Sequence, residues 1–118
     1  MATFLETGPS QGQLGPALMY RTSTHVSNSA QGIVTISNRL GLHARPATAL
    51  AELAGSFTAE IKLRRIDTDH QVDAKSIMQL LMLAATRGTE LEVTADGNDA
   101  SEALAAIADL VSSHFGEE

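Results

Sequence analysis

The sequence has no cysteine and no tryptophan, and aromatic residues make up only 3% of it. The missing cysteines exclude a disulfide framework and a thiolate metal site. The scarcity of aromatic side chains argues against a surface that stacks unpaired nucleic-acid bases, because such a surface needs exposed rings. A chain without cysteine also fits the reducing cytosol, where disulfides are rare.

Basic residues are outnumbered in this 118-residue chain, with 8 lysines and arginines against 14 aspartates and glutamates, a net charge of −6. A nucleic-acid-binding protein typically carries a basic face, so we expect no nucleic-acid partner. No apolar run approaches the roughly 20 residues of a membrane-spanning helix. The N-terminal residues do not follow the basic-then-apolar order of a signal peptide. The sequence therefore predicts a cytoplasmic protein without membrane insertion, and its length suits one domain with a modest core.

Composition divides the chain into two parts. Residues 1–31 are rich in Gly, Ser, Thr, Gln and Pro and show no sustained hydrophobic period, which predicts a flexible N-terminal extension. Residues 32–118 carry the periodic patterns of a folded domain. In its first strand, predicted at 33–37, Val34 and Ile36 are expected to face the core.

The remaining elements follow from apolar periodicity and turn residues. We expect further strands at 57–66, 70–73 and 90–95, and helices that begin near residues 44, 76 and 99 and end near Gly55, Gly88 and residues 114–116. Ser76 with Gln79, and Asp99 with Glu102, have the spacing of N-cap pairs. The order β-α-β-β-α-β-α predicts an α+β fold, in which a four-stranded antiparallel sheet carries three helices on one face and is open on the other.

The most informative stretch is Gly-Leu-His-Ala-Arg-Pro-Ala at residues 41–47. Pro46 fits the first turn of a helix, which places the helix start near residues 44–46. The first-turn N–H groups lack intrahelical acceptors and lie at the positive end of the helix dipole, so an anion is favoured there. Arg45 adds donors suited to phosphate, and His43 supplies a nucleophilic nitrogen. Together they indicate phosphoryl transfer onto His43, although a lone histidine beside a helix start is usually a polar loop or capping residue.

This stretch resembles the active-site signature of the histidine-containing phosphocarrier family HPr, of the phosphoenolpyruvate-dependent sugar phosphotransferase system. A second motif, Lys75-Ser76-Ile77-Met78, is similar to that family too, and an apolar run at 80–85 and Gly88 follow it. The resemblance covers residues 32–118 and implies an HPr-like open-faced β-sandwich. The extension at residues 1–31 lies outside the resemblance and departs from a typical single HPr.

The resemblance implies roles for individual residues. His43 looks like the phosphoryl acceptor, through its Nδ1, and Arg45 looks like the residue that pairs with the phosphoryl group. The backbone N–H groups of Ala44 and Arg45 are implied to help hold it. Ser76 matches the serine that HPr kinase/phosphorylase modifies in many bacteria, although a serine at a helix N-cap needs no regulation to explain it. The positions that match the partner-docking surface are Thr48, Ile77, Met78 and Leu81, although a Met-Leu stripe is more often part of a core.

The resemblance also implies partners. Enzyme I would charge the carrier, sugar-specific enzyme IIA components would receive the phosphoryl group, and HPr kinase/phosphorylase would be a further partner. Such a carrier forms a phosphohistidine intermediate without turning over alone, and it needs no cofactor and no metal.

Three other functions stay open. The first is a carrier of the nitrogen-regulatory branch, which shares the histidine motif, although the intact second motif favours the sugar branch. The second is a regulator that binds partners through the Ser76 face. The third is a generic α+β ligand-binding domain. It explains less, because the sequence has no Gly-rich phosphate loop, metal-ligand cluster or pair of catalytic acids.

Overall fold

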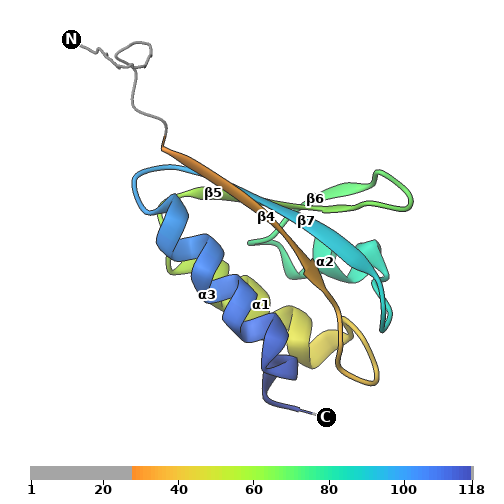
Figure 1. Ribbon diagram of the computed structural model, residues 1–118. Helices are drawn as coiled ribbons and strands as arrows, with labels where there is room; N and C mark the ends of the chain where they lie inside the picture. Colours follow the sequence, from red (N-terminus) through yellow and green to blue (C-terminus); the bar gives the residue numbers. More distant parts are fainter. Residues whose placement is uncertain (1–27, 118) are drawn as a thin grey trace, which may run out of the picture.

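The computed structural model describes residues 28–117, which form an antiparallel sheet with helices packed on one face (Figure 1). The strands are β4 (Ser29–Thr35), β5 (Glu60–Arg65), β6 (Gln71–Asp73) and β7 (Glu90–Asp96), and the helices are α1 (Ala44–Gly55), α2 (Ile77–Leu83), α3 (Ala100–Ser112) and the short 3₁₀ helix η1 (His114–Gly116). The 4-stranded sheet has the order β4-β7-β5-β6. The predicted α+β fold and its element order are confirmed. No helix within this part of the chain is long and apolar enough to cross a membrane.

The first strand begins earlier than the sequence predicts. β4 pairs with β7 along its whole length, from Ser29 opposite Asp96 to Thr35 opposite Glu90. Residues 29–31, which the sequence places in the extension, therefore belong to the sheet, because ladder hydrogen bonds to β7 support a segment of low strand propensity. The rest of the predicted extension, residues 1–27, lies outside the described residues.

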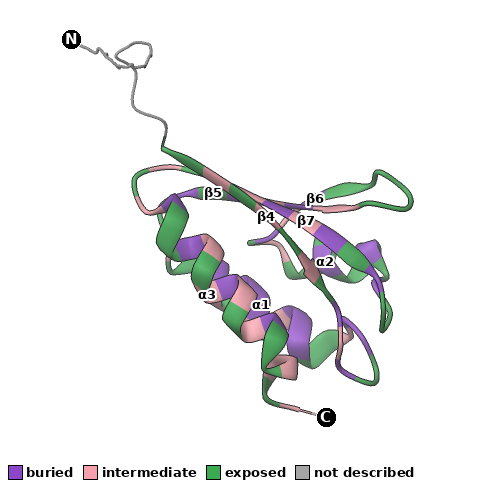
Figure 2. Ribbon diagram, in the orientation of Figure 1, coloured by how far each residue is buried: buried purple, intermediate pink, exposed green. Residues whose placement is uncertain are grey.

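The core lies between the sheet and the helices, where Figure 2 shows the buried residues gathered. In β5 and β7 the alternate positions Ile61, Leu63, Leu91 and Val93 are buried. The helices add Leu50, Ile107 and Val111 from α1 and α3, and Leu80 and Leu83 from α2. Full burial of one such side chain contributes about 1.5–3 kcal/mol, so this layer, rather than helix propensity, holds the helices on the sheet.

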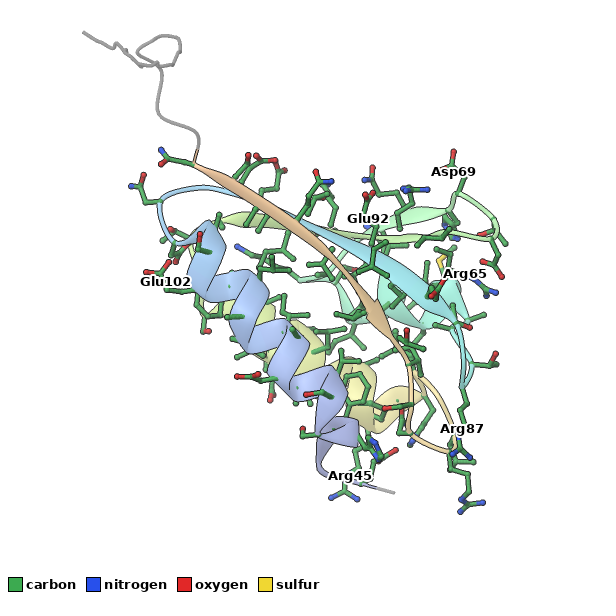
Figure 3. The ribbon with its side chains drawn as sticks, in the orientation of Figure 1. Arg45, Arg65, Asp69, Arg87, Glu92 and Glu102 are labelled. Carbon is green, nitrogen blue, oxygen red and sulfur yellow. The ribbon has the colours of Figure 1, made fainter. Side chains whose placement is uncertain are left out.

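The opposite face of the sheet is polar, as the alternation predicts. Arg64 on β5 donates to Glu92 on β7 at 2.9 Å and to Asp69 in the hairpin turn at 2.9 Å. Figure 3 shows Glu92 and Asp69 on the side of the sheet away from α1 and α3. These hydrogen bonds raise the pKa of the Arg64 guanidinium, with Glu92 as the larger cause. Because the pairs are partly exposed, they order the surface rather than supply much stability.

The two predicted N-cap pairs have different outcomes. Ser76 caps α2, since its Oγ accepts from the backbone N–H of Gln79 at 3.2 Å. Asp99 precedes α3 but makes no side-chain cap bond. Its carboxylate instead accepts from the N–H groups of Thr58 at 2.9 Å and Ala59 at 2.8 Å, so the predicted capping pair is wrong. These backbone donors, Thr58 first, lower the pKa of Asp99, which ties the start of α3 to the segment before β5.

Helix α2 is shorter than predicted, because the sequence places its end near Gly88. It ends at Leu83 because Ala84 adopts a left-handed conformation, with φ 55° and ψ 38°. A non-glycine residue there costs about 1–2 kcal/mol. Nη1 of Arg65 lies 3.1 Å from the carbonyl oxygens of both Leu83 and Ala84, and it donates to acceptors that the helix leaves free. This tertiary contact stabilises an ending that local propensity does not favour.

Candidate functional site

The segment between β4 and α1 forms a tight loop that places His43 at the start of α1. His43 is the N-cap residue, in an extended conformation, and Ala44 begins the helix as predicted. Gly41 makes the bend, with φ +71°. The loop is fastened to the segment after α2, because the N–H of Leu42 donates to the carbonyl of Ala85 at 2.8 Å. A Cβ on Gly41 would lie 2.5 Å from that same Ala85 oxygen, so both the conformation and the space require glycine.

The structure brings the two predicted phosphoryl-handling side chains to one place. His43 and Arg45 both line an open pocket of about 290 Å³ at the N-terminus of α1, with Arg39, Leu40 and Glu117. The side chain of His43 is 38% exposed, so its ring can be reached by a group held on another protein. The first-turn N–H groups of Ala44 and Arg45 belong to the set that finds no acceptor within a helix. An anion placed here would meet a guanidinium and the positive end of the helix.

Glu117 is a residue of the site that sequence reasoning missed. Its Oε1 lies 3.0 Å from Nε2 of His43, and it accepts from Nδ2 of Asn38 at 3.0 Å. The same Asn38 nitrogen donates to the carbonyl of Gly41 at 2.8 Å. The hydrogen bond with His43 is the main reason why the pKa of Glu117 is lowered, with Asn38 and then the charges of His43 and Arg45 adding to it. No local signal marks this contact, because it joins positions 74 residues apart.

The C-terminal segment that carries Glu117 is a tight turn. His114, Phe115 and Gly116 have φ values of 60°, 56° and 75°. The N–H of Glu117 donates to the carbonyl of His114 at 2.9 Å, which closes the turn. Phe115 packs against the core and anchors it. The sequence predicts only that the last helix ends near residues 114–116, whereas the structure places His114 beside a second pocket.

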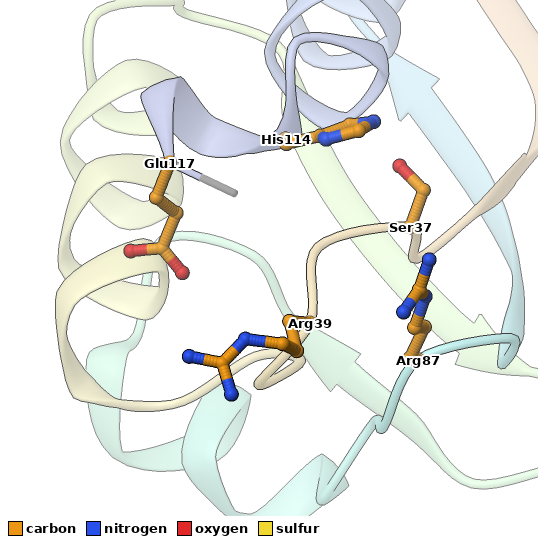
Figure 4. A pocket seen from close by; sticks show the side chains of 5 residues that line it. All are labelled: Ser37, Arg39, Arg87, His114 and Glu117. Carbon is orange, nitrogen blue, oxygen red and sulfur yellow. The ribbon is translucent and has the colours of Figure 1, made fainter.

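That second pocket, of about 420 Å³, adjoins the first through Arg39 and Glu117. Figure 4 shows its lining: Ser37 and Arg39 come from the segment after β4, Arg87 from the segment after α2, and His114 and Glu117 from the C-terminal segment. Within residues 28–117, the guanidinium groups of Arg39, Arg45 and Arg87 take part in no ion pair or hydrogen bond, whereas those of Arg64 and Arg65 are paired. Figure 3 shows Arg45 and Arg87 at the same end of the molecule. This end therefore presents unpaired positive charge.

Helix α2 contributes an exposed apolar surface. Ile77, Met78, Leu81 and Met82 have exposed fractions of 39%, 72%, 38% and 67%. We call these four residues the α2 patch; the sequence predicts three of them as docking positions and does not include Met82. Leu80 and Leu83 point the other way and are buried. Thr48, the remaining predicted docking residue, is half-buried and donates its hydroxyl to the carbonyl of Ala44 at 2.8 Å.

No group of three or more His, Asp or Glu side chains in the described range is arranged to hold a metal ion. Ser76 lies at the N-terminal end of the α2 patch, half-buried, with its hydroxyl occupied as the helix cap. The site as a whole offers a nucleophilic ring, cationic donors and an apolar surface for another protein. It suits transfer of an anionic group between proteins better than turnover of an enclosed small substrate.

Comparison with known proteins gives the same indication. A family model described as "PTS HPr component phosphorylation site" matches residues 30–113. The phosphocarrier protein HPr of Cupriavidus necator is 47% identical over 83 residues, which cover 70% of this chain and 91% of that protein. The phosphocarrier protein NPr of Escherichia coli is 46% identical over 85 residues, which cover 72% of this chain and 93% of that protein.

Solved structures agree with the sequence relatives. The crystal structure of HPr-C-His from Thermoanaerobacter tengcongensis superposes with a TM-score of 0.71 at 37% identity, over 75% of this chain and 98% of that one. An HPr from Bacillus anthracis superposes with a TM-score of 0.66 at 38% identity, over 70% and 96% of the two chains. Sequence and fold thus agree, and the chain belongs to the HPr family of phosphocarrier proteins of the phosphotransferase system.

Proposed function

We propose that this chain accepts a phosphoryl group on Nδ1 of His43 from phosphorylated enzyme I and passes it to sugar-specific enzyme IIA components. The observation that carries the proposal is the half-exposed His43 ring at the first turn of α1, in one pocket with Arg45. It stands within a segment that matches the phosphorylation-site model of the family. The phosphocarrier role is that of the family, and the residue assignments are the proposal.

The chemistry needs little from this chain beyond positioning and charge. The lone pair on Nδ1 of His43 attacks the phosphorus held on the donor's histidine. The new P–N bond forms as the donor's P–N bond breaks, and the donor ring leaves with the electron pair of that bond. Negative charge spread over the transferring oxygens is stabilised by Arg45 and by the N–H groups of Ala44 and Arg45. The helix terminus contributes about 0.3–1 kcal/mol, up to about 2 when partly buried.

The α2 patch is proposed as the docking surface for both donor and acceptor, together with Thr48. The loop that carries His43 is bonded to the segment after α2 through Leu42 and Ala85, so the patch and the phosphoryl site belong to directly connected parts of the fold. Met78, at 72% exposure, is the most exposed member. Methionine adapts its shape to different surfaces, which suits a carrier that meets at least two partners.

Ser76 is proposed as a regulatory phosphorylation site for HPr kinase/phosphorylase. Its hydroxyl accepts from Gln79 at 3.2 Å, and a phosphate could accept from the same donor at the helix N-terminus. The added charge of about −1.5 to −2 would then lie at the edge of the α2 patch. We therefore expect weaker docking of enzyme I with little change of structure.

A charge-mimicking variant tests this regulation. Ser76→Asp should raise the KM for this carrier in transfer from enzyme I. Ser101→Asp is the matched control, since Ser101 is exposed in the first turn of α3, away from the patch. Equal KM values for Ser76→Asp and wild type would contradict the docking argument and leave Ser76 as a simple helix cap.

The carrier role itself is tested by phosphoryl uptake. The protein is incubated with enzyme I and phosphoenolpyruvate, and an acid-labile mass gain of one phosphate is measured. We expect uptake by wild type, none by His43→Ala, and normal uptake by His70→Ala, because His70 is exposed in the β5–β6 turn. Uptake by His43→Ala would refute the assignment. No uptake by wild type with a cognate enzyme I would favour a binding regulator that acts through the Ser76 face.

A carrier of the nitrogen-regulatory branch is the second candidate. It is favoured by the similarity to proteins named NPr, at 46% identity, beside HPr at 47%. The two candidates are separated by measuring kcat/KM for uptake from the sugar-branch enzyme I and from its nitrogen-branch counterpart. The branch whose donor gives the higher value is the branch served.

A further inference from the structure

We propose that Glu117 is a positioning residue that selects Nδ1 of His43 as the phosphorylated nitrogen, by holding the proton on Nε2 and balancing the positive charge that develops on the ring. The inference rests on the proposed phosphoryl transfer to His43. It adds a residue outside the segment matched by the family model, which ends at residue 113.

The geometry fixes the carboxylate as well as the ring. Oε1 of Glu117 lies 3.0 Å from Nε2 of His43 and 3.0 Å from Nδ2 of Asn38. Asn38 is fully buried, and its amide also donates to the carbonyl of Gly41 at 2.8 Å. The side chain of Glu117 is only 20% exposed. The acceptor is therefore held in place by the same loop that carries the histidine.

The chemistry follows from what each group can do. An ionised carboxylate only accepts hydrogen bonds, so Nε2 of His43 must be the donor. A neutral imidazole has one N–H, and if that proton is on Nε2, the in-plane lone pair is on Nδ1. When Nδ1 attacks phosphorus, the ring gives up that lone pair to the new P–N bond and becomes an N-phosphoimidazolium that keeps its Nε2 proton. The Glu117 carboxylate then faces a cation, which strengthens the hydrogen bond during the reaction.

The surrounding charges support an ionised Glu117. Arg45 on α1 and Arg39 after β4 line the same pocket, and His114 and Arg87 line the adjoining one. Hydrogen bonds from His43 and Asn38 lower the pKa of the Glu117 carboxyl group. Near neutral pH the group facing Nε2 is therefore an anion that cannot donate.

Backbone strain gives an independent reason to assign Glu117 a role. His114 and Phe115, neither of them glycine, have φ values of 60° and 56° immediately before it. Each left-handed non-glycine residue is unfavourable and persists only where its surroundings require it. The turn brings the chain back from the end of α3 to the start of α1. One left-handed residue is enough to end a helix, as Ala84 does for α2, so the second successive one at Phe115 is not needed to end α3.

The first test reads the tautomer in the unphosphorylated protein. Long-range ¹H–¹⁵N correlation spectra distinguish a protonated ring nitrogen from an unprotonated one. We expect the neutral ring of His43 in wild type to carry its proton on Nε2 and none on Nδ1. In Glu117→Gln the side-chain amide can either donate or accept, so a mixture of tautomers is expected. Glu102→Gln, at an exposed position of α3, is the control that should leave the spectrum unchanged.

The second test measures transfer from phosphorylated enzyme I. Glu117→Gln should lower the limiting rate about three- to tenfold, the range expected for one partly exposed charge-assisted hydrogen bond. The KM should stay close to that of wild type, because the α2 patch is untouched. A purely structural or docking role would instead change the KM or the unfolding midpoint.

The outcomes separate this proposal from the carrier proposal. A wild-type His43 protonated on Nδ1, or a Glu117→Gln variant with unchanged tautomer and limiting rate, would overturn the role of Glu117 even if His43 accepts phosphate. Failure of wild-type uptake would overturn the carrier assignment and, with it, the catalytic part of this inference. The tautomer spectra would still decide whether Glu117 sets the protonation of the ring.

Discussion

Replacing Gly41 with alanine should damage both the fold and the site, and the structure gives the size of the effect. A left-handed φ of +71° costs an alanine about 1–2 kcal/mol. The new Cβ would lie 2.5 Å from the carbonyl oxygen of Ala85 and 2.9 Å from Cα of Thr86, so backbone must move. Movement there weakens the 2.8 Å bond from Leu42 to Ala85, at a cost of about 1–3 kcal/mol. We expect a total destabilisation of about 2–5 kcal/mol.

Urea unfolding measures this loss of stability, and the m-values of variant and wild type are compared to check that unfolding stays two-state. Gly55→Ala is the matched control, because no atom lies within 4 Å of its added Cβ at the end of α1. That change should be neutral or stabilise by up to about 1 kcal/mol. If Gly41→Ala lies within about 0.5 kcal/mol of wild type, a threshold typical of surface changes, the steric reasoning is refuted. The same variant should also slow phosphoryl uptake at saturating enzyme I, because the loop that presents His43 is displaced.

Three further changes test the assignment of core, docking surface and loop anchor. Leu80→Ala, at a fully buried position, should lower the free energy of unfolding by about 2–5 kcal/mol in urea titrations. Met78→Ala, at 72% exposure, should change it by less than about 0.5 kcal/mol yet raise the KM for transfer from enzyme I; an unchanged KM would argue against the α2 patch as docking surface. Asp99→Asn should lower the urea midpoint at neutral pH. The pKa of Asp99 is lower in the folded state, so the stability that its carboxylate contributes is present above the unfolded pKa of about 3.9 and is lost as the pH falls through the folded value. The urea midpoints of wild type and Asp99→Asn should therefore converge in acid.

Local patterns were enough to predict the elements whose identity depends on neighbouring residues. Alternation at Ile61 and Leu63 predicted a half-buried strand, and both residues are buried. Pro46 placed the start of α1, because proline is tolerated only in a first turn. Ser76 predicted its own cap, since the bond spans three residues. In each case, the interaction that decides the structure lies within one or two turns of chain.

The features that the sequence analysis missed or predicted wrongly each depend on a partner that is far away in the sequence. Asp99 looks like the first residue of a capping box, but the N–H groups of Thr58 and Ala59 offer it two donors from another element. The early start of β4 depends on its ladder with β7. The contact between Glu117 and His43 is closed by a left-handed turn whose residues, apart from one glycine, carry no turn signal. Sequence periodicity contains no information about such contacts.

The charge distribution fits the double task of a carrier, which must bind a donor and an acceptor in turn and be held by neither. The net charge of the chain is −6, yet the end that holds His43 presents the guanidinium groups of Arg39, Arg45 and Arg87. Exposed charge of this kind speeds encounter with an acidic partner, and it adds little lasting affinity because solvent and salt screen it. The small α2 patch would then supply contact without the large apolar area of a permanent interface. A buried site would bind the phosphoryl group more tightly and release it to an acceptor less easily. An open pocket beside an unpaired cationic surface therefore suits a protein that receives a phosphoryl group and passes it on.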